Sequence, residues 1–405
     1  MTSELTPIDI ALNNILNSLP SISEAEQSEI IQSVSRILAA DITAPADVPG
    51  ADNSAMDGYA VNSADLATVP SMLPVSQRIA AGRVGEALES GTAARIFTGA
   101  PLPVGADAVV MQENCEVLND SVTILQTIMP GENVRKKGGD IQNGAIVFAA
   151  GHRLRIQDIG TLASAGVASV EVKRRLKVAV LTTGDELVRP GTPLGIGQIY
   201  NSNYYAIASL LQALGMEILD LGIVADSLDS TLASLEQAGR GADCIISSGG
   251  VSVGEEDHVK AAVTKMGSLD LWKLAIKPGK PFAYGSVLGK PFFGLPGNPV
   301  SAFVTFVLLV KPALLKLSGA NNTDTVHYPL PSGFDLIRSG ERQEYLRVSL
   351  YSDSSGNTKL MPFVSQSSGV GSSVSVTDGL AIVPPFTSVQ EGDMLTFAPF
   401  TELVL

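Results

Sequence analysis

Cysteine and histidine are scarce in this chain. It has two cysteines, Cys115 and Cys244, and three histidines among 405 residues. Neither cysteine belongs to a C-x-x-C pair, and the histidines, His152, His258 and His327, are scattered. These spacings argue against a disulfide framework and against a zinc site built from Cys and His. Such a composition is typical of a protein of the reducing cytoplasm, which is the location that we expect.

Basic side chains and long apolar runs are also in short supply. The 27 Lys and Arg are outnumbered by 41 Asp and Glu, which gives a formal net charge of -14. Nucleic acids and anionic membranes are bound by clustered Lys and Arg, so neither partner is expected. The N-terminal segment lacks the basic and apolar regions of a signal peptide. The most apolar stretch begins at Pro299 and is interrupted by Lys311 and Pro312, so it is expected to be a buried helix rather than a membrane span.

What the chain has in abundance is aliphatic residues, with 45% hydrophobic but only 5% aromatic residues. A chain of this length is expected to form two to four domains. Two helices are expected before residue 45. In the first, "TPIDIALNNILNSL", Thr6 would be the N-cap and Pro7 the first helical residue; in the second, "SISEAEQSEIIQSVSRILAA", Ser23 and Glu26 form a capping-box pattern.

Residues 46–142 have a different pattern, with short apolar runs such as "ARIFT" and "SVTILQTI" between Gly and Pro turns. This pattern predicts a small all-β domain. Residues 143–175 return to a helical pattern. We therefore expect a β domain, 46–142, inserted into a helical linker or dimerisation domain formed by 1–45 and 143–175.

Strand and helix patterns alternate over residues 176–320, which predicts a central, doubly wound α/β domain with a mostly parallel sheet. Ligands bind such sheets beyond the carboxyl ends of the strands. Residues 321–405 carry four further strand patterns and are expected to form a C-terminal β barrel. The expected fold class is a multidomain α/β plus β protein.

Three strands of the α/β region end in glycines and small polar residues. These segments are "TTGDEL" (182–187), "SSGGVSVGEED" (247–257) and "GLPGNPVS" (294–301). Glycine permits close backbone approach to a ligand, and a following helix N-terminus supplies free N–H groups, so each turn could hold an oxyanion. Because the strand ends of a parallel sheet share one edge, the three turns together predict an anion site. In "GLPGNPVS" the prolines and Asn298 also suit a rigid strand-to-helix turn.

Acidic and basic side chains accompany these turns. The carboxylates would repel a bound anion unless a divalent cation lay between them, and Mg²⁺ prefers such oxygen ligands. The alternative is that they only cap helices. The loop "WKLAIKPGKPF" (272–282) carries three lysines, Lys273, Lys277 and Lys280, which could hold an anion there or form an ordinary solvated turn.

Seven segments in order resemble the molybdopterin molybdenumtransferase (MoeA) family, which includes the E domain of gephyrin-like proteins. They are the three turns above with "SAMDGYAV" (54–61), "FTGAPLPVGADAVVMQE" (97–113), "PGENVR" (130–135) and "KPGKP" (277–281). The resemblance implies an elongated four-domain homodimer whose active site lies between the α/β domain of one subunit and the β domain of the other. It also implies that molybdate and adenylylated molybdopterin, with Mg²⁺, give molybdenum cofactor and AMP.

The resemblance assigns roles to individual residues. Catalytic roles fall on Asp57, Thr98, Asp140, Glu186, Asp226 and Asp257, and the last three of these would hold the metal. Contacts to molybdate or the pterin substrate fall on Gly249, Gly250, Ser252, Lys273, Lys277, Lys280, Pro296, Pro299, Ser301, Arg347 and Ser368. For Asp57 a purely structural role is also open, because Met-Asp-Gly is a good turn in which Asp bonds its own backbone.

Two departures from the family pattern stand out. Gly139 occupies a position where the family usually has Glu, which puts the ligand contact of that loop in doubt, and His258 replaces an aromatic or other residue. Two other functions remain open: the preceding adenylyl transfer to molybdopterin, and a non-catalytic dimeric scaffold of the gephyrin type. Possible protein partners are the upstream adenylyltransferase and the chaperones of molybdoenzymes.

Overall fold

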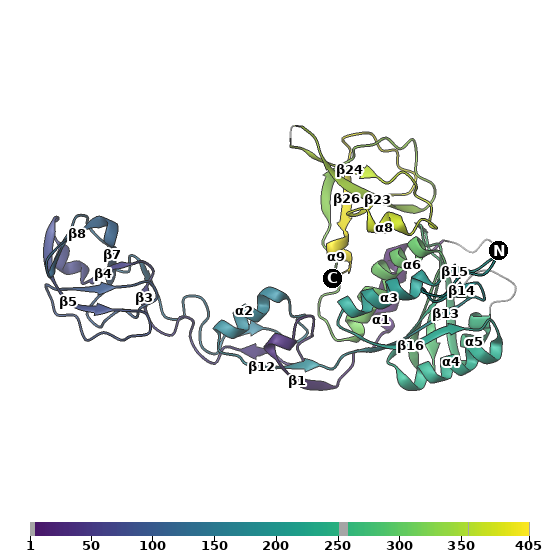
Figure 1. Ribbon diagram of the computed structural model, residues 1–405, viewed down its shortest axis with the longest axis horizontal. Coiled ribbons are helices and arrows are strands. Elements are labelled where there is room, and N and C mark those ends of the chain that lie inside the picture. The colour runs from purple at the N-terminus through teal and green to yellow at the C-terminus, as the bar shows by residue number, and fades with distance from the viewer. Residues whose placement is uncertain (1–4, 251–257, 355, 405) are drawn as a thin grey trace.

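The molecule is elongated, with a β domain at one end and an α/β body at the other, joined by a thin linker (Figure 1). The computed structural model describes residues 5–250, 258–354 and 356–404. The chain leaves the α/β body, runs through the linker to the β domain and returns through the linker. The multidomain α/β architecture with several β-rich sheets is therefore confirmed.

The α/β body is built on a six-stranded sheet in the order β16, β13, β17, β21, β20, β18. The first four strands are parallel to one another, and β20 and β18 are antiparallel. Strands β20 and β21 form an antiparallel hairpin, and in its turn Leu288 and Gly289 both have positive φ, as a tight hairpin requires. The strands are β13 (Lys177–Thr183), β16 (Glu217–Val224), β17 (Cys244–Ser248), β18 (Gly267–Lys273), β20 (Pro281–Val287) and β21 (Lys290–Leu295).

Helices cover both faces of this sheet. Along β13, Val178 and Val180 pack in one apolar core, whereas Ala179 and Leu181 pack in the other, because successive side chains of a strand alternate between faces. The first core includes residues of α1 (Ile8–Ser18), α3 (Ser202–Ala213), α6 (Pro299–Thr305) and α7 (Lys311–Leu317); the second includes α4 (Leu228–Gly241) and α5 (His258–Met266). The doubly wound arrangement expected for this region is present.

The apolar stretch that begins at Pro299 is a core helix. Helices α6 and α7 are joined by a π-helical segment, Phe306–Val310. Within the described residues, Pro299–Leu317 is the one helical stretch that is long and apolar enough to cross a membrane, and 83% of it is buried inside the protein. Its hydrophobicity is explained by its place in the core, as expected from the sequence.

The second helix expected near the N-terminus is not formed. Residues Ala25–Glu29 are strand β1, which pairs antiparallel with β12 (Ser169–Lys173), and only a 3₁₀ turn, Ile30–Gln32, follows. The partner strand lies far away in the sequence, so pairing with it overrides the local capping-box signal. Helix α1 does form, but it begins at Ile8 with Pro7 at the N-cap position, one residue later than expected. It packs against α7 in the α/β body and not in the linker.

The linker consists of two strand pairs and one helix. Strand β1 pairs with β12, β2 (Ile42–Thr43) pairs with β11 (Ile146–Phe148), and α2 (Ile156–Ser164) lies beside them. Its small core is formed by Leu38, Leu154, Leu162, Val170 and Val172. The linker is therefore as much β as helical, which corrects the all-helical expectation for this part of the chain.

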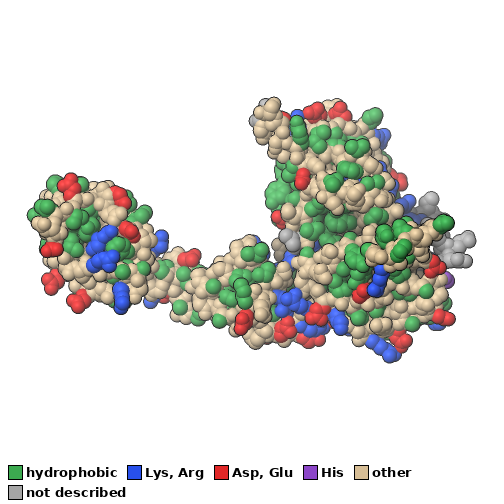
Figure 2. All heavy atoms as spheres, in the orientation of Figure 1, with side chains coloured by type: hydrophobic (Ala, Val, Ile, Leu, Met, Phe, Trp, Pro, Cys, Tyr) green, Lys and Arg blue, Asp and Glu red, His purple; other side chains and the backbone are tan. Residues whose placement is uncertain are grey.

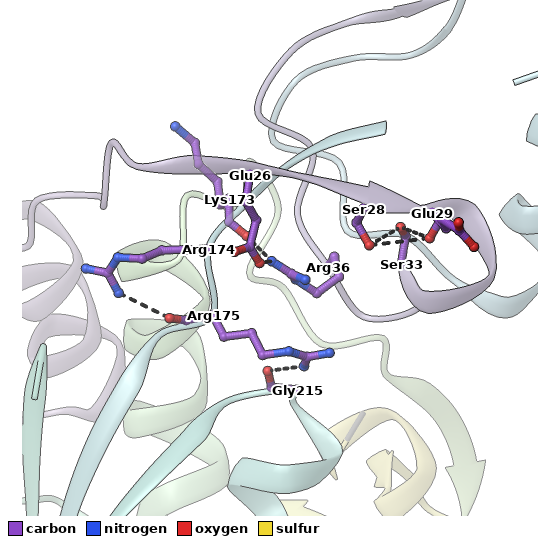
Figure 3. Close-up of polar contacts among 9 residues, drawn as sticks. All are labelled: Glu26, Ser28, Glu29, Ser33, Arg36, Lys173, Arg174, Arg175 and Gly215. Atoms are coloured by element: carbon purple, nitrogen blue, oxygen red, sulfur yellow. Dashed lines mark hydrogen bonds and ion pairs between the residues drawn. The ribbon is translucent and has the colours of Figure 1, made fainter. Parts of the chain in front are cut away.

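Basic side chains fix the junction between the linker and the α/β body (Figure 3). Arg36 donates to the Lys173 carbonyl at 2.7 Å and pairs with the carboxylate of Glu26, while Arg175 donates to the Gly215 carbonyl at 2.6 Å. Arg174 donates to both carboxylate oxygens of Asp243, the residue directly before β17, and the shorter bond is 2.7 Å long. Figure 2 shows acidic and basic side chains side by side at this junction.

The inserted β domain contains a six-stranded sheet in the order β7, β4, β6, β5, β9, β8. Its strands are β4 (Gly58–Val61), β5 (Ser71–Ile79), β6 (Ala93–Ile96), β7 (Ala108–Met111), β8 (Cys115–Leu118) and β9 (Ser121–Ile124), and β3 (Asn53–Ser54) pairs with β10 (Val134–Arg135) beside them. Short 3₁₀ turns, Ser63–Leu66 and Gln112–Asn114, connect strands that are consecutive in the sequence, β4 to β5 and β7 to β8.

The C-terminal domain is a curled sheet that is joined to the α/β body by strand pairing. Strands β22 (Tyr328–Pro331), β26 (Met394–Pro399), β25 (Gly379–Val383), β23 (Gln343–Ser352) and β24 (Thr358–Pro362) follow one another, and a bridge between Ser332 and Leu360 joins the two ends. Strand β19 (Ile276–Lys277), from the lysine loop, pairs parallel with β23. Two short helices, α8 (Ser372–Ser375) and α9 (Phe400–Val404), complete the domain.

Candidate active site

The glycine-rich turns predicted from the sequence meet at one edge of the α/β sheet. There they line a cleft of about 760 Å³ beyond the carboxyl ends of β13, β16, β17 and β21. Parallel strands end at the same edge, and this is where such sheets bind ligands. Among the predicted site residues, Glu186, Asp226, Gly249, Gly250, Pro296 and Pro299 line this cleft.

Glycine is required at the turn after β17. Gly249 has φ +91°, and a Cβ atom there would lie 2.7 Å from the carbonyl oxygen of Thr183. Gly250 has φ +65°, and its Cβ would lie 2.4 Å from a methyl group of Val259. Both the left-handed backbone and the close neighbours exclude a side chain. The turn therefore leaves bare backbone at the floor of the cleft.

Two carboxylates face the cleft. Glu186 follows β13 and Asp226 follows β16, and both residues are exposed. The N–H of Asp226 donates to Asp185 Oδ1 at 3.3 Å, so the turns after β13 and β16 are joined. In the described part of the chain no three His, Cys, Asp or Glu side chains gather closely enough to hold a metal ion by themselves. The predicted site residues Ser252 and Asp257 lie outside the described residues.

Two asparagines that the sequence analysis missed shape the same cleft. Asn201 caps α3 by accepting a bond from the Tyr204 N–H, and its amide donates to Thr182 Oγ1 at 2.8 Å. Asn203 donates to Ser248 Oγ at 2.9 Å and to the Gly297 carbonyl at 2.8 Å. Asn203 thus ties the turn after β17 to the turn after β21. The available signal was Asn201 in the "YNSN" segment, at the cap position of α3, where Asn is favoured; Asn203 lies in the first turn of the helix.

The three predicted lysines are not among the residues that line the cleft: Lys273 ends β18, and Lys277 and Lys280 follow it in the chain. Lys277 and Lys280 are exposed and Lys273 is half-buried, while Pro281, the residue after Lys280, lines the cleft. Lys277 Nζ lies 3.2 Å from the buried carboxylate of Glu344. Strand β19 holds this pair together, because Lys277 and Glu344 are directly opposite in its ladder with β23.

The C-terminal domain contributes a wall of the cleft through the loop 365–371. Arg347 lies beneath this loop and is fully buried. Its Nη2 donates to the carbonyls of Ser365 and Ser367, both at 3.0 Å, and its Nε donates to Ser373 Oγ at 3.2 Å. Burial lowers the pKa of this guanidinium, and Arg347 Nη1 is buried without a hydrogen-bond partner among the described residues.

The same loop reaches the turn after β21. The Val300 N–H donates to the Ser368 carbonyl at 3.1 Å, and Gly369 lines the cleft. The predicted residue Ser301 lies in α6 beside this contact, but it is only 5% exposed. Ser368 thus contacts the "GLPGNPVS" turn through its backbone carbonyl. The order of the motifs along the chain did not predict this contact.

Asp57 and Thr98 lie together in the β domain, at the other end of the molecule (Figure 1). Asp57 Oδ1 accepts bonds from the N–H and from the hydroxyl of Thr98, both at 2.8 Å. These bonds, with a smaller effect of the positive charge of Arg95, lower the pKa of Asp57. The carboxylate therefore joins two turns, instead of bonding its own backbone as the structural alternative supposed.

Asp140 lies on the return path from the β domain to the linker. Its backbone N–H donates to the Val48 carbonyl at 2.9 Å, and its side chain is exposed. It lines a groove of about 650 Å³ beside α2, together with Gly139 and Asp158. Within one chain, the predicted site residues thus fall into separate groups: the cleft, the β domain and the linker.

Three family models match consecutive parts of the chain. "MoeA N-terminal region (domain I and II)" matches residues 6–166, "Probable molybdopterin binding domain" matches 179–316, and "MoeA C-terminal region (domain IV)" matches 329–400. A relative from Haemophilus influenzae named molybdopterin molybdenumtransferase is 38% identical over 98% of this chain and 99% of its own length. This chain belongs to the MoeA family. The resemblance seen in the motifs and the enzyme class that it implied, a molybdopterin molybdenumtransferase, are confirmed.

Other relatives of this MoeA family protein agree. A molybdopterin molybdenumtransferase from Nostoc is 39% identical over 84% of this chain and 81% of the relative. A crystal structure of the molybdopterin biosynthesis MoeA protein of Pyrococcus horikoshii OT3 has a TM-score of 0.82 and 28% identity, covering 98% of this chain and 100% of that one. The likeness extends over the elongated arrangement of all the domains.

Proposed function

We propose that this MoeA family protein inserts molybdenum from molybdate into adenylylated molybdopterin, releasing AMP and forming molybdenum cofactor. The observation that carries the proposal is the cleft at the carboxyl edge of the α/β sheet. It combines bare glycine backbone, two carboxylates and a wall from the C-terminal domain. Positioning and electrostatic compensation are the main means by which a protein promotes the transfer of such anionic groups.

Molybdate and the phosphate groups of the substrate are anions, so they need positive charge where they meet. The lysine loop borders the cleft at Pro281, and Lys277 is held in place by Glu344. The Nη1 group of Arg347, beneath the loop that carries Ser368, is a donor without a partner among the described residues. We infer that Lys273, Lys277, Lys280 and the Arg347 loop compensate the bound anions, with Ser301 and Ser368 as further contacts, together with Ser252, outside the described residues.

We propose Mg²⁺ as the cofactor, held by Glu186 and Asp226 with Asp257, which lies outside the described residues. Mg²⁺ is usually bound by one or two carboxylates together with substrate phosphates, and a cleft with two exposed carboxylates fits this habit. When bound, the ion would neutralise charge on the phosphate oxygens. The chain would place the two carboxylates on separate turns, Glu186 after β13 and Asp226 after β16. The bond from the Asp226 N–H to Asp185 fixes these two turns relative to each other.

We further propose that the complete site forms between two copies of the chain. Asp57 and Thr98 lie at the opposite end of the molecule from the cleft of their own chain (Figure 1). An elongated chain can bring these groups to a cleft if a second copy supplies the cleft, and homodimers are the commonest oligomers. Asp140, on the linker path, would also serve this composite site. The domain division proposed for this assembly is 1–45 with 143–175, 46–142, 176–320 and 321–405, except that α1 (Ile8–Ser18) packs in the α/β body.

The remaining assignments come from the family likeness. We propose a cytoplasmic enzyme that receives its substrate from an upstream adenylyltransferase and delivers its product to chaperones of molybdoenzymes. Adenylyl transfer by this chain is disfavoured, because its relatives named molybdenumtransferase match it over the β domain and the C-terminal domain as well. A scaffold without catalysis would have no need of the paired carboxylates in the cleft.

The direct test is release of AMP and formation of molybdenum cofactor from adenylylated molybdopterin, molybdate and Mg²⁺. We expect molybdate-dependent turnover by the native chain and its loss in the Glu186→Gln and Lys277→Ala variants. Lys316→Ala, which removes an exposed lysine from α7, is the matched control and should keep full activity. A folded, dimeric native chain without turnover would overturn the enzymatic proposal and favour the scaffold.

The shared site has its own test, by complementation between inactive variants. Asp57→Ala and Glu186→Ala chains are co-expressed, so that mixed dimers contain one site with both residues intact. Activity should return to about a quarter of the native value, because about half of the dimers are mixed. The control mixture, Glu186→Ala with Asp226→Ala, places both defects in the same cleft and should stay inactive. Equal activity of the two mixtures would refute a site shared between subunits.

A further inference from the structure

The turns that carry Asp57 and Thr98 are joined by a side chain that no motif singled out. Arg95 lies in β6, between β4 and β5, and is directly opposite Tyr59 on one side and Arg78 on the other. Directly opposite residues project from the same face of a sheet. Because β6 lies between β4 and β5, Arg95 can contact both the turn that carries Asp57, before β4, and the turn that carries Thr98, after β6.

Arg95 binds the Asp57 turn directly at one point and through Gln112 at a second. Its Nη1 donates to the Gly58 carbonyl at 2.8 Å, directly after Asp57. Its Nη2 donates to Gln112 Oε1 at 2.6 Å, and the backbone N–H of Gln112 in turn donates to the Asp57 carbonyl at 3.1 Å. A planar guanidinium can make two such bonds in fixed directions, which an ammonium group cannot do. The backbone on both sides of the Asp57 carbonyl is thus fixed by one side chain.

Arg95 also contacts the turn that carries Thr98. Its guanidinium lies over the ring of Phe97, the residue before Thr98, at 4.5 Å from the ring centroid, and at 5.2 Å from the ring of Tyr59. A cation placed over the face of an aromatic ring within about 6 Å of its centroid is attracted to the ring. One side chain therefore bridges the two turns whose contact is the bond from Thr98 to Asp57.

We propose that Arg95 is a positioning residue for the reaction: it holds the Asp57 and Thr98 turns in the geometry that the shared active site requires. The inference rests on the proposed function of Asp57 and Thr98, and it adds a residue that acts through them. Arg95 itself contacts backbone, Gln112 and aromatic rings, so no contact with substrate is needed for this role.

Arg78 supplies a matched control from the same face of the sheet. Its guanidinium lies 4.4 Å from the centroid of the same Phe97 ring. Within the described part of the chain it makes no hydrogen bond to either turn, and it is exposed. Arg78→Gln and Arg95→Gln therefore remove the same charge and the same type of stacking, but only the second removes the bonds to the Asp57 turn.

The experiment compares native protein, Arg95→Gln, Arg95→Lys and Arg78→Gln as full-length dimers. Displacement of a reacting group by about 1 Å costs on the order of a hundredfold in rate, so Arg95→Gln should lower kcat by roughly 10- to 100-fold with little change in KM. Arg78→Gln should stay within about twofold of native. Arg95→Lys keeps the charge but not the two-point bond, so its kcat should also be low.

Two further readouts separate positioning from a general loss of stability. Hydrogen exchange at the Thr98 amide, which bonds to Asp57, should accelerate in both Arg95 variants and not in Arg78→Gln. The acidic limb of the kcat/KM profile should move to higher pH in Arg95→Gln, because the positive charge that helps to lower the pKa of Asp57 is lost, and should stay in place in Arg95→Lys.

The outcomes distinguish this inference from the proposed function. Native-like kcat and Thr98 exchange in Arg95→Gln, or equal losses in Arg78→Gln, would overturn the positioning role. If the native chain itself shows no turnover, the proposed function fails, yet the exchange measurement still decides whether Arg95 holds the two turns together.

Discussion

Replacing Gly249 with alanine tests the physical reasoning behind the cleft. The left-handed backbone of Gly249, with φ +91°, costs a residue with a Cβ about 1–2 kcal/mol. The new Cβ would also lie 2.7 Å from the Thr183 carbonyl oxygen, and relieving such a backbone contact costs about 1–3 kcal/mol. We therefore expect Gly249→Ala to destabilise the α/β body by about 2–5 kcal/mol.

The protein carries a specific probe for this measurement. Its single tryptophan, Trp272, lies in β18 of the α/β sheet, with ring centroids 6.1 Å from Phe282 and 5.8 Å from Tyr284. Its fluorescence during urea unfolding therefore reports on the α/β body. With a slope of about 2 kcal/mol per molar urea, the midpoint should fall by roughly 1–2.5 M.

Gly297→Ala is the matched control, because Gly297 lines the same cleft but a Cβ there would meet nothing within 4 Å. Its midpoint should stay within about 0.3 M of native, since open surface substitutions change stability by less than about 0.5 kcal/mol. If Gly249→Ala unfolds at the same urea concentration as Gly297→Ala, the argument that strain reserves this position for glycine is wrong.

Two buried charges give predictions that depend on pH. Burial raises the pKa of Asp158, but bonds from Arg155 and His152 outweigh this and hold it below 3.8, so its stabilisation is present above that pH and is lost as pH falls. Asp158→Asn should cost about 1–2 kcal/mol at pH 7 in thermal unfolding, because Asp158 caps α2 and its partner Arg155 is 61% exposed. An equal cost at pH 3 or below would contradict the assignment. Burial lowers the pKa of Lys311 from 10.5 to about 8. Between pH 8 and pH 10.5 the folded chain has lost this proton whereas the unfolded chain still holds it, so stability should rise by about 3 kcal/mol as the pH increases. Lys311→Met should abolish this rise, whereas Lys316→Met, an exposed control, should retain it.

The sequence was a good guide to the cleft because local signals and sheet geometry agree there. Each glycine turn could be located by its own residues, and the parallel strands that precede them necessarily end at one edge. The same argument explains the two core faces, since the alternation along β13 is a property of any strand. Residue types alone were enough to predict Glu186 and Gly249 as neighbours of one cleft.

The failures came where contacts between distant segments decide the structure. Strand β1 had a good helix signal in Ser23 and Glu26, but β12 offers it a complete ladder of backbone bonds. The position of Arg95 between two turns depends on the strand order of the β domain, which its local sequence does not specify. Asn203 was missed for the same reason, because its two partners follow different strands.

Arg347 shows how the structure changes the meaning of a residue that the motifs had already selected. Three of its bonds go to Ser365, Ser367 and Ser373, so most of its donors hold the loop that forms a wall of the cleft. A charged donor without a partner is costly to bury, and among the described residues Arg347 Nη1 is such a donor. Arg347 therefore shapes the wall of the cleft from beneath, and Lys at this position could not make the same three bonds, because an ammonium group lacks the planar fork of donors.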